Sequence, residues 1–318
     1  MSKKTGFIAA GVCVAVGAMV CGGAAVAANG DFTKLGTSSF QMREYEISEE
    51  FHNISIDTVT AEIRFCLSND GKAKVVCFER ESVSHSVSVD AGTLEITATD
   101  EREWYEYIWN FGNEMITVYL PEVEYGTLTV EADTSDIDLP PPFRFESLDI
   151  SVSTGDINCD ACVLGSVKIT TSTGDIELER MSAGSIELSV STGDINLEEV
   201  TVAGELKFIV TTGEAELEKV TCKTLYTKGS TGDVHLEAVT ATETMTIVRS
   251  TGDVRLERSD AAELFLKTST GDVTGTLLTN KTFTYSTDTG DVRLPSTQSG
   301  GKCEIRTSTG DIRIGIVK

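Results

Sequence analysis

The sequence predicts an all-β fold, a single-stranded parallel β-solenoid (β-helix) with coils of 19–20 residues, and three observations support it. The tripeptide Thr-Gly-Asp, once Thr-Gly-Glu, recurs at steps of 19 or 20 residues. Apolar residues occupy the same positions relative to each glycine, and no apolar pattern of helical length interrupts the repeats. A fixed period of this kind is typical of stacked repeats, in which neighbouring copies supply each other's core.

Each repeat predicts a strand, a turn and a second strand. The positions seven and five before the glycine are apolar in nearly every copy, as Leu148 and Ile150 are before Gly155, and polar residues alternate with them. Alternation with a period of two indicates half-buried strands. A propeller blade needs about 40 residues, and a meander would not require the same apolar position in every copy. The predicted turn glycines are Gly155, Gly174, Gly193, Gly213, Gly232, Gly252, Gly271, Gly290 and Gly310.

The turn residues have a physical explanation. Glycine adopts positive φ without steric cost, and an aspartate side chain bonds to nearby backbone N–H groups. In stacked coils the carboxylates would also form a row about 4.8 Å apart, which a divalent cation such as Ca²⁺ would stabilise. The turn-forming role is favoured, since the Gly-Gly-x-Gly-x-Asp pattern of calcium-binding β-rolls is absent. The residues of the alternative cation row are Asp156, Asp175, Asp194, Asp233, Asp253, Asp272, Asp291 and Asp311.

Residues 1–30 predict one N-terminal transmembrane helix. Lys3 and Lys4 precede an uncharged run from Phe7 to Ala28, which as a helix would span about 33 Å, enough for a bilayer core. The lysines predict a cytoplasmic N-terminus and an extracellular remainder, a single-pass protein of the cell membrane. Ala25-Val26-Ala27 leaves open a cleaved signal peptide and a secreted protein. Residues 31–42 are predicted to be a linker.

Residues 43–130 predict atypical N-terminal coils with a cap, and residues 131–318 the regular solenoid. Ile54 stands seven before Ala61, as in the repeats, so the solenoid is expected to begin near residue 50. The sequence Asn69-Asp70-Gly71 predicts a hairpin turn, and this insertion is expected to cap the first coil. At the other end the last strand contains Ile312, Ile314 and Ile316 and is not followed by a charged tail. This predicts an exposed strand edge that is available for self-association.

An aromatic segment interrupts the cap. Trp104, Tyr105, Tyr107 and Trp109 lie within six residues of one another. They are candidates for contact with a partner, either sugar rings or the membrane surface. Packing over the open end of the solenoid is the favoured alternative, because Trp104 and Ile108 fall at helical spacing.

Composition excludes several classes of function. The net charge of −24 argues against nucleic acid or anionic lipid as a partner. The three histidines show no ligand spacing, so no metal and no cofactor are predicted. Cys159 and Cys162 have a redox spacing, but they align with apolar positions of the next repeat and are expected to fill the core. No catalytic motif is present, and no catalytic residue is assigned.

The repeated Ser-Thr-Gly-Asp-Ile/Val copies, the lysine-flanked apolar run and Trp104-Tyr105 resemble a family of β-strand-repeat proteins of the bacterial cell envelope. The family bears the name "putative adhesin" and is a domain of unknown function. The resemblance covers about residues 45–318 and implies a membrane-tethered extracellular β-solenoid without catalytic residues. Three functions remain open: an adhesin or scaffold that binds a protein or glycan, an envelope-stress regulator that binds a membrane partner, and a polysaccharide-acting β-helix enzyme.

Overall fold

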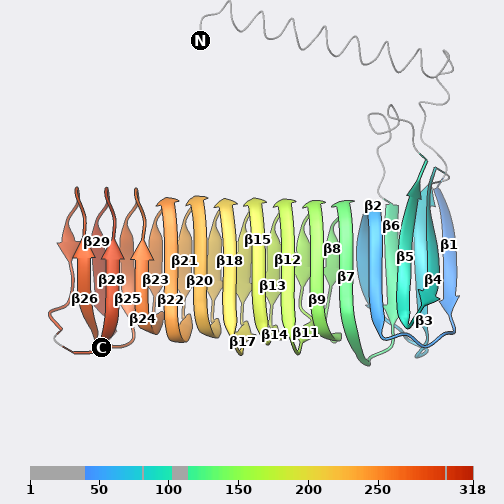
Figure 1. The fold of residues 1–318 in the computed structure, drawn as a ribbon, viewed down its shortest axis with the longest axis horizontal. Coiled ribbons are helices and arrows are strands. Elements are labelled where there is room, and N and C mark those ends of the chain that lie inside the picture. Colours follow the sequence, from blue (N-terminus) through green and yellow to red (C-terminus); the bar gives the residue numbers. More distant parts are fainter. Residues whose placement is uncertain (1–39, 81, 102–113, 298, 318) are drawn as a thin grey trace, which may run out of the picture.

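The computed structural model describes residues 40–80, 82–101, 114–297 and 299–317, and their regular structure is β-strand throughout. Figure 1 shows these strands stacked side by side along one axis, so that the described chain forms a rod. The predicted all-β solenoid is confirmed for this part of the chain. The described residues contain no helix that is long and apolar enough to cross a membrane.

The strands fall into three groups along the rod. The N-terminal group comprises β1 (Phe40–Ile47), β2 (Asn53–Leu67), β3 (Ala73–Arg80), β4 (Val83–Asp90), β5 (Thr93–Asp100), β6 (Glu114–Leu120), β7 (Glu124–Thr134) and β8 (Ile137–Leu139). The central group comprises β9 (Arg144–Thr154), β10 (Ile157–Cys159), β11 (Cys162–Val163), β12 (Ser166–Thr173), β13 (Ile176–Glu179), β14 (Ser182–Ala183), β15 (Ser185–Thr192), β16 (Ile195–Glu198), β17 (Thr201–Val202), β18 (Glu205–Thr212), β19 (Ala215–Glu218), β20 (Thr221–Thr231), β21 (Val234–Glu237), β22 (Thr240–Thr251) and β23 (Val254–Glu257). The C-terminal group comprises β24 (Asp260–Lys267), β25 (Val273–Leu277), β26 (Lys281–Ser286), β27 (Val292–Arg293), β28 (Gly301–Arg306) and β29 (Ile312–Ile316).

Neighbouring central coils pair in parallel and in the predicted register. Val167 of β12 lies opposite Leu148 of β9 on one side and opposite Ile186 of β15 on the other. All three side chains are about 1% exposed. Each apolar position of the repeat therefore forms a column through the interior, and burial of one such aliphatic side chain contributes about 1.5–3 kcal/mol.

The glycine turns bring successive coils into close contact. All nine repeat glycines have φ between 121° and 151°, a region that side chains of L-residues rarely occupy. A Cβ atom on Gly174 would lie 2.1 Å from the carbonyl oxygen of Gly155. The N–H of Gly174 donates to Thr192 O of the following coil at 3.0 Å. Glycine is thus required both by the backbone conformation and by the lack of space.

The N-terminal end starts where the sequence predicts but contains an additional coil. β2 pairs in parallel with β7, with Ile54 opposite Leu128, so the solenoid does begin near residue 50. Along its other edge β2 pairs in parallel first with β5 and then with β6, with Ile63 opposite Ile116. A coil made of β5 and β6 therefore lies outside β2, although it comes later in the chain.

Antiparallel strands close this end of the rod. β3 pairs with β6 on one side and with β1 on the other, and β4 pairs with β5. The predicted hairpin at Asn69-Asp70-Gly71 is wrong, because β6 lies between β2 and β3 although the chain does turn there, with Gly71 at φ 73°. The segment that follows this turn, β3, lies at the end of the rod between β6 and β1. β1 starts at Phe40, inside the stretch that we predicted as a linker.

The C-terminal end differs from the prediction. β28 pairs with both β24 and β26, and β29 pairs with both β25 and β27. The last coil in the sequence is therefore inserted between the two coils that precede it. The expected exposed edge at Ile312, Ile314 and Ile316 is wrong, since Ile312 is 0% and Ile314 5% exposed.

Arg249 places a buried cation in the apolar interior of the central coils. Arg249 is 1% exposed, and its Nη1 donates to Val210 O at 2.9 Å. Gly229 of the neighbouring coil leaves room for it, since a Cβ there would lie 1.6 Å from Nη1. Nε and Nη2 have no hydrogen-bond partner among the described residues. Burial lowers the pKa of Arg249, and the charge of Asp233 opposes that shift.

We expect Arg249→Met to raise the free energy of unfolding by about 1–4 kcal/mol, because replacing a buried charge by an apolar side chain of similar volume removes a desolvation cost. Urea unfolding followed by circular dichroism measures this. The matched control is Arg255→Met on the exposed face of β23, which should change stability by less than about 0.5 kcal/mol. A loss of stability in Arg249→Met alone would contradict the interpretation.

Candidate functional site

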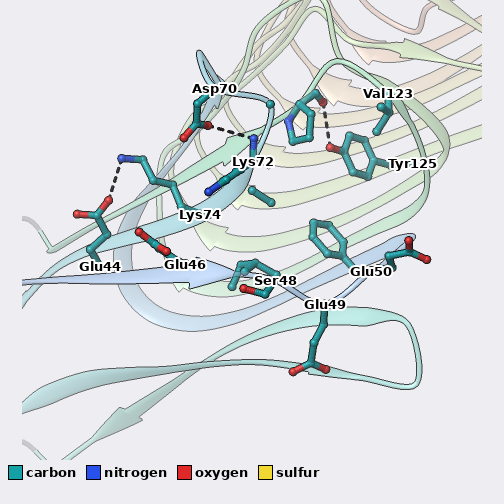
Figure 2. Close-up of a pocket in the computed structure, with 15 residues that line it drawn as sticks. Glu44, Glu46, Ser48, Glu49, Glu50, Asp70, Lys72, Lys74, Val123 and Tyr125 are labelled. Atoms are coloured by element: carbon teal, nitrogen blue, oxygen red, sulfur yellow. Dashed lines mark hydrogen bonds and ion pairs between the residues drawn. The ribbon is translucent and has the colours of Figure 1, made fainter.

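A groove of about 690 Å³ lies at the N-terminal end of the rod (Figure 2). It is enclosed by the end of β1 and residues 48–51, by the turn between β2 and β3, and by the segment 121–125 that leads into β7. These three segments meet because β1 pairs with β3 along its whole length, with Glu44 opposite Val76 and Ile47 opposite Ala73. We call this hollow the cap groove.

The floor of the cap groove is apolar and firmly held. The ring of Phe51 stacks on Tyr125 with a centroid distance of 6.0 Å, and Tyr125 in turn contacts Phe145 at 5.7 Å. The hydroxyl of Tyr125 donates to Pro121 O at 2.9 Å. Burial raises the pKa of Tyr125 to about 12, so the phenol stays neutral. Val123 adds an apolar side chain that is 53% exposed.

The rim of the cap groove is acidic. Lys74 Nζ lies 2.9 Å from Glu44 Oε1, and this contact raises the pKa of Lys74. Hydrogen bonds from the Lys72 backbone N–H and from the Ser68 hydroxyl lower the pKa of Asp70. Figure 2 shows both of the Lys74 and Lys72 contacts.

Three carboxylates of the rim form no ion pair within the described chain, although Glu46 lies opposite Lys74, whose ammonium group contacts Glu44 instead. Glu46, Glu49 and Glu50 are exposed, and none of them forms an ion pair with another residue described in the structure. The lining contains neither histidine nor cysteine. Its carboxylates are spread over an open rim instead of converging in a shielded pocket, as acid–base catalysis on a glycosidic bond requires. The arrangement is suited to binding a cationic and partly apolar segment.

A second cluster of chemically active side chains lies inside the cap. His85 of β4 donates its backbone N–H to Glu79 Oε2 at 2.7 Å, and its Nδ1 lies 2.8 Å from the same oxygen. Its Nε2 is 3.1 Å from the Thr58 hydroxyl, and Arg43 Nε lies 3.1 Å from Glu79 Oε1. Cys77 completes a group of three metal-type donors within 4.8 Å. The spacing of the histidines in the sequence did not indicate this cluster around His85.

This cluster is a polar network that holds the cap strands together. Both ring nitrogens of His85 and both oxygens of Glu79 already have neighbours, one of which is the cation Arg43. Burial, followed by the charge of Glu79, raises the pKa of Cys77 to about 12, so this thiol stays protonated. A metal would need a thiolate and would have to displace these contacts. We therefore assign the cluster a structural role, which joins β1, β3 and β4 to β2.

The row of turn aspartates is a ladder of hydrogen bonds. Asp156 Oδ1 accepts the backbone N–H of Asp175 at 2.8 Å, and Asp175 Oδ1 accepts that of Asp194 at 2.7 Å. The same bond joins Asp233 to Asp253, Asp253 to Asp272, Asp272 to Asp311 and Asp311 to Asp291. The aspartates thus accept backbone N–H groups as predicted, but from the turn of the neighbouring coil instead of from their own turn. Cation binding by the row stays a prediction.

Other predicted residues are placed as follows. Cys159 is 0% exposed and fills the core as expected, and burial raises its pKa to about 12. Cys162 is half-buried, and its Sγ lies 3.2 Å from the Ser182 hydroxyl, so it does not occupy the core position we expected. The predicted contact residues Trp104, Tyr105, Tyr107 and Trp109 lie outside the described residues, as does the predicted anchor.

Comparison with known proteins identifies the family. The model of the family described as Toastrack DUF4097 matches residues 51–214 and 204–318. The chain belongs to this family. The family that the repeats resemble, a domain of unknown function named for adhesins, is thereby confirmed. No curated protein matches the chain.

Several solved structures are similar to this Toastrack chain. A putative adhesin from Parabacteroides distasonis ATCC 8503 has a TM-score of 0.54 at 11% identity, over 87% of this chain and 98% of that one. A putative adhesin from Bacteroides fragilis NCTC 9343 has a TM-score of 0.41 at 16% identity, over 88% and 98%. A putative lipid binding protein from Parabacteroides distasonis ATCC 8503 has a TM-score of 0.44 at 14% identity, over 89% and 98%. These proteins are named for adhesion or binding and not for an enzymatic activity.

We expect Glu79→Ala to lower the free energy of unfolding by about 3–5 kcal/mol, because it leaves two buried donors of His85, the backbone N–H and Nδ1, without an acceptor. Guanidinium chloride unfolding measures this. Glu95→Ala on exposed β5 is the control and should be nearly neutral. Equal effects of the two substitutions would mean that the buried network does not stabilise the cap.

Proposed function

We propose that this Toastrack protein is an exported, non-catalytic interaction module of the cell envelope. It is held in the membrane by residues 7–28 and binds a protein partner through the cap groove. The uncharged run behind Lys3 and Lys4 supports the anchor and the extracellular location of the rod. The adhesin name of the similar Parabacteroides distasonis structure supports a role in binding.

The observation that carries the proposal is the combination of floor and rim in the cap groove. A lysine or arginine side chain has an apolar stem and a cationic head. Its stem would cover Phe51 and Val123, while its head would reach Glu46, Glu49 or Glu50, whose charges have no partner in the described chain. A neutral glycan would cover the same floor but would leave these carboxylates unpaired. The groove therefore favours a peptide segment with alternating basic and apolar residues.

The position of the groove favours a partner near the membrane. β1 begins at Phe40, shortly after the predicted anchor, and the groove lies at the end of this same strand. The groove lies at the end of β1 that points away from Phe40, about 26 Å along this eight-residue strand. A partner in the groove would therefore lie within a few nanometres of the membrane surface if residues 7–28 span the bilayer. This supports the second candidate function, an envelope-stress regulator that binds a membrane protein, in which the groove is the sensing surface.

We expect full-length protein in detergent micelles to bind a fluorescent peptide of alternating lysine and leucine, and Glu49→Lys/Glu50→Lys to weaken binding at least tenfold. Fluorescence anisotropy at physiological ionic strength measures the affinity. The matched control is Glu177→Lys/Glu198→Lys on the exposed face of β13 and β16, which changes the net charge by the same amount and should keep the affinity of the wild type.

Two outcomes would contradict the proposed binding site. Equal weakening by both double variants would show that the peptide is attracted by the net charge of −24 and not by the groove. Absence of binding by the wild type, together with binding of a neutral oligosaccharide, would replace the peptide by a glycan as the ligand.

A further inference from the structure

The two ends of the rod are built differently. Antiparallel strands close the N-terminal end, as described above. The other end stops at the coil formed by β26 and β27, where β26 pairs only with β28 and β27 only with β29 among the described residues. Figure 1 shows β26 as the outermost strand at this end. An unpaired strand edge presents backbone N–H and C=O groups that can pair with another chain.

This end also exposes positions that belong to the core. Phe283 and Tyr285 of β26 lie opposite Cys303 and Ile305 of β28, which are both 0% exposed. Tyr285 itself is 54% exposed, and Phe283 is only partly buried. The apolar columns of the solenoid are therefore open to solvent here, with no further coil to cover them.

A hollow beside the last coil adds to this apolar surface. It has a volume of about 660 Å³, and Leu294, Pro295, Ile314 and Ile316 are among the residues that line it. The whole end face thus combines a free strand edge with an open core and an adjacent apolar hollow. Natural proteins normally protect such an edge by charges, prolines or a covering segment.

The edge strand has few of these protective features. The Thr297 hydroxyl donates to Lys281 O, and the Thr282 hydroxyl donates to Gly300 O at 3.5 Å, so a neighbouring segment contacts only its first two residues. From Thr282 to Ser286, β26 contains neither a charged residue nor a proline. Its one charge, Lys281, is 2% exposed and is paired with Asp260 at 2.6 Å. Tyrosine, phenylalanine and threonine, which make up most of this strand, favour β-pairing.

The charge of this region permits two copies to approach. Residues 281–318 contain six lysines and arginines against four aspartates and glutamates, although the whole chain has a net charge of −24. Two rods that meet elsewhere would bring together surfaces with an excess of carboxylates. At this end the repulsion is absent, because the local charges nearly balance.

We propose that two copies of this chain join end to end through β26, related by a two-fold axis that places the two β26 strands antiparallel. The surface is then the same on both copies, and each open core covers the other. The capped end of a second rod does not offer this fit, because its outer strand β1 bears Arg43, Glu44 and Glu46 and its core is already closed. The assembly is a rod of double length with a cap groove at each far end.

The mass of the full-length protein in detergent micelles, measured by light scattering with correction for bound detergent, tests the proposal. We expect a dimer at micromolar concentration. Tyr285→Lys places a charge in the contact and should raise the dimer dissociation constant at least tenfold. Tyr226→Lys, the same substitution on the outer face of β20 in the middle of the rod, should leave the mass unchanged. A monomeric wild type, or a dimer that persists in Tyr285→Lys, would overturn the proposal.

A crosslinking experiment tests the orientation. Thr284 lies near the middle of β26, so Thr284→Cys should form a disulfide with the same residue of the second copy under mild oxidation. Thr246→Cys on β22 is the control and should not crosslink, as the wild-type cysteines should not. A dimer without the Thr284→Cys crosslink, or particles larger than dimers, would contradict the two-fold arrangement. Circular dichroism melting confirms that each variant is folded.

Discussion

The structure depends on the close contact between successive glycine turns. At each turn the chain passes so near to the carbonyl oxygen of the previous turn that only a hydrogen atom fits on Cα. The glycines let the turns keep the spacing of about 4.8 Å that the parallel strand ladders require, and from Gly155 onward the coils stay in register. The register in turn aligns the apolar columns inside and the aspartate hydrogen bonds outside. A repeat of only 19–20 residues can therefore specify a long rod, since every coil meets the same local requirement.

The regular part of this rod could be predicted from the sequence because its contacts are local to the repeat. The positions of Leu148, Val167 and Ile186 relative to their glycines identify the column that they form. The order of the last coils could not be predicted in this way. Leu264 can pair equally well with Phe283 or with Cys303, since both residues occupy the same position of the motif. Which of the two residues pairs with Leu264 depends on how the ends of the rod are covered, and a repeat pattern contains no information on that.

The candidate site could not be predicted from the sequence for a related reason. The acidic residues Glu49 and Glu50 and the turn at Asp70 were visible as isolated features of an irregular region. They meet only because β1 pairs with β3 and because β6 lies between β2 and β3. His85 reaches Glu79 across the connection between β3 and β4, where Arg80 pairs with Val83, and no ligand spacing in the sequence identified this contact. The sequence did contain one signal, the change from regular repeats to irregular strands. This change indicated the part of the chain that departs from the solenoid and can form a binding surface.

Different parts of the molecule have different structural roles. The repeats supply a stiff rod, the N-terminal cap supplies the polar groove, and the C-terminal coil leaves a free edge. The rod that carries both ends depends on the stacking of the glycine turns, so the free energy of unfolding of Gly232→Ala, compared with that of Lys228→Ala in the same coil, tests the account most directly. A Cβ at Gly232 would lie 1.9 Å from Gly213 O, at a φ of 121°. We expect a loss of at least about 3 kcal/mol for Gly232→Ala and less than about 0.5 kcal/mol for the exposed Lys228→Ala. Equally small losses in both variants would contradict the account.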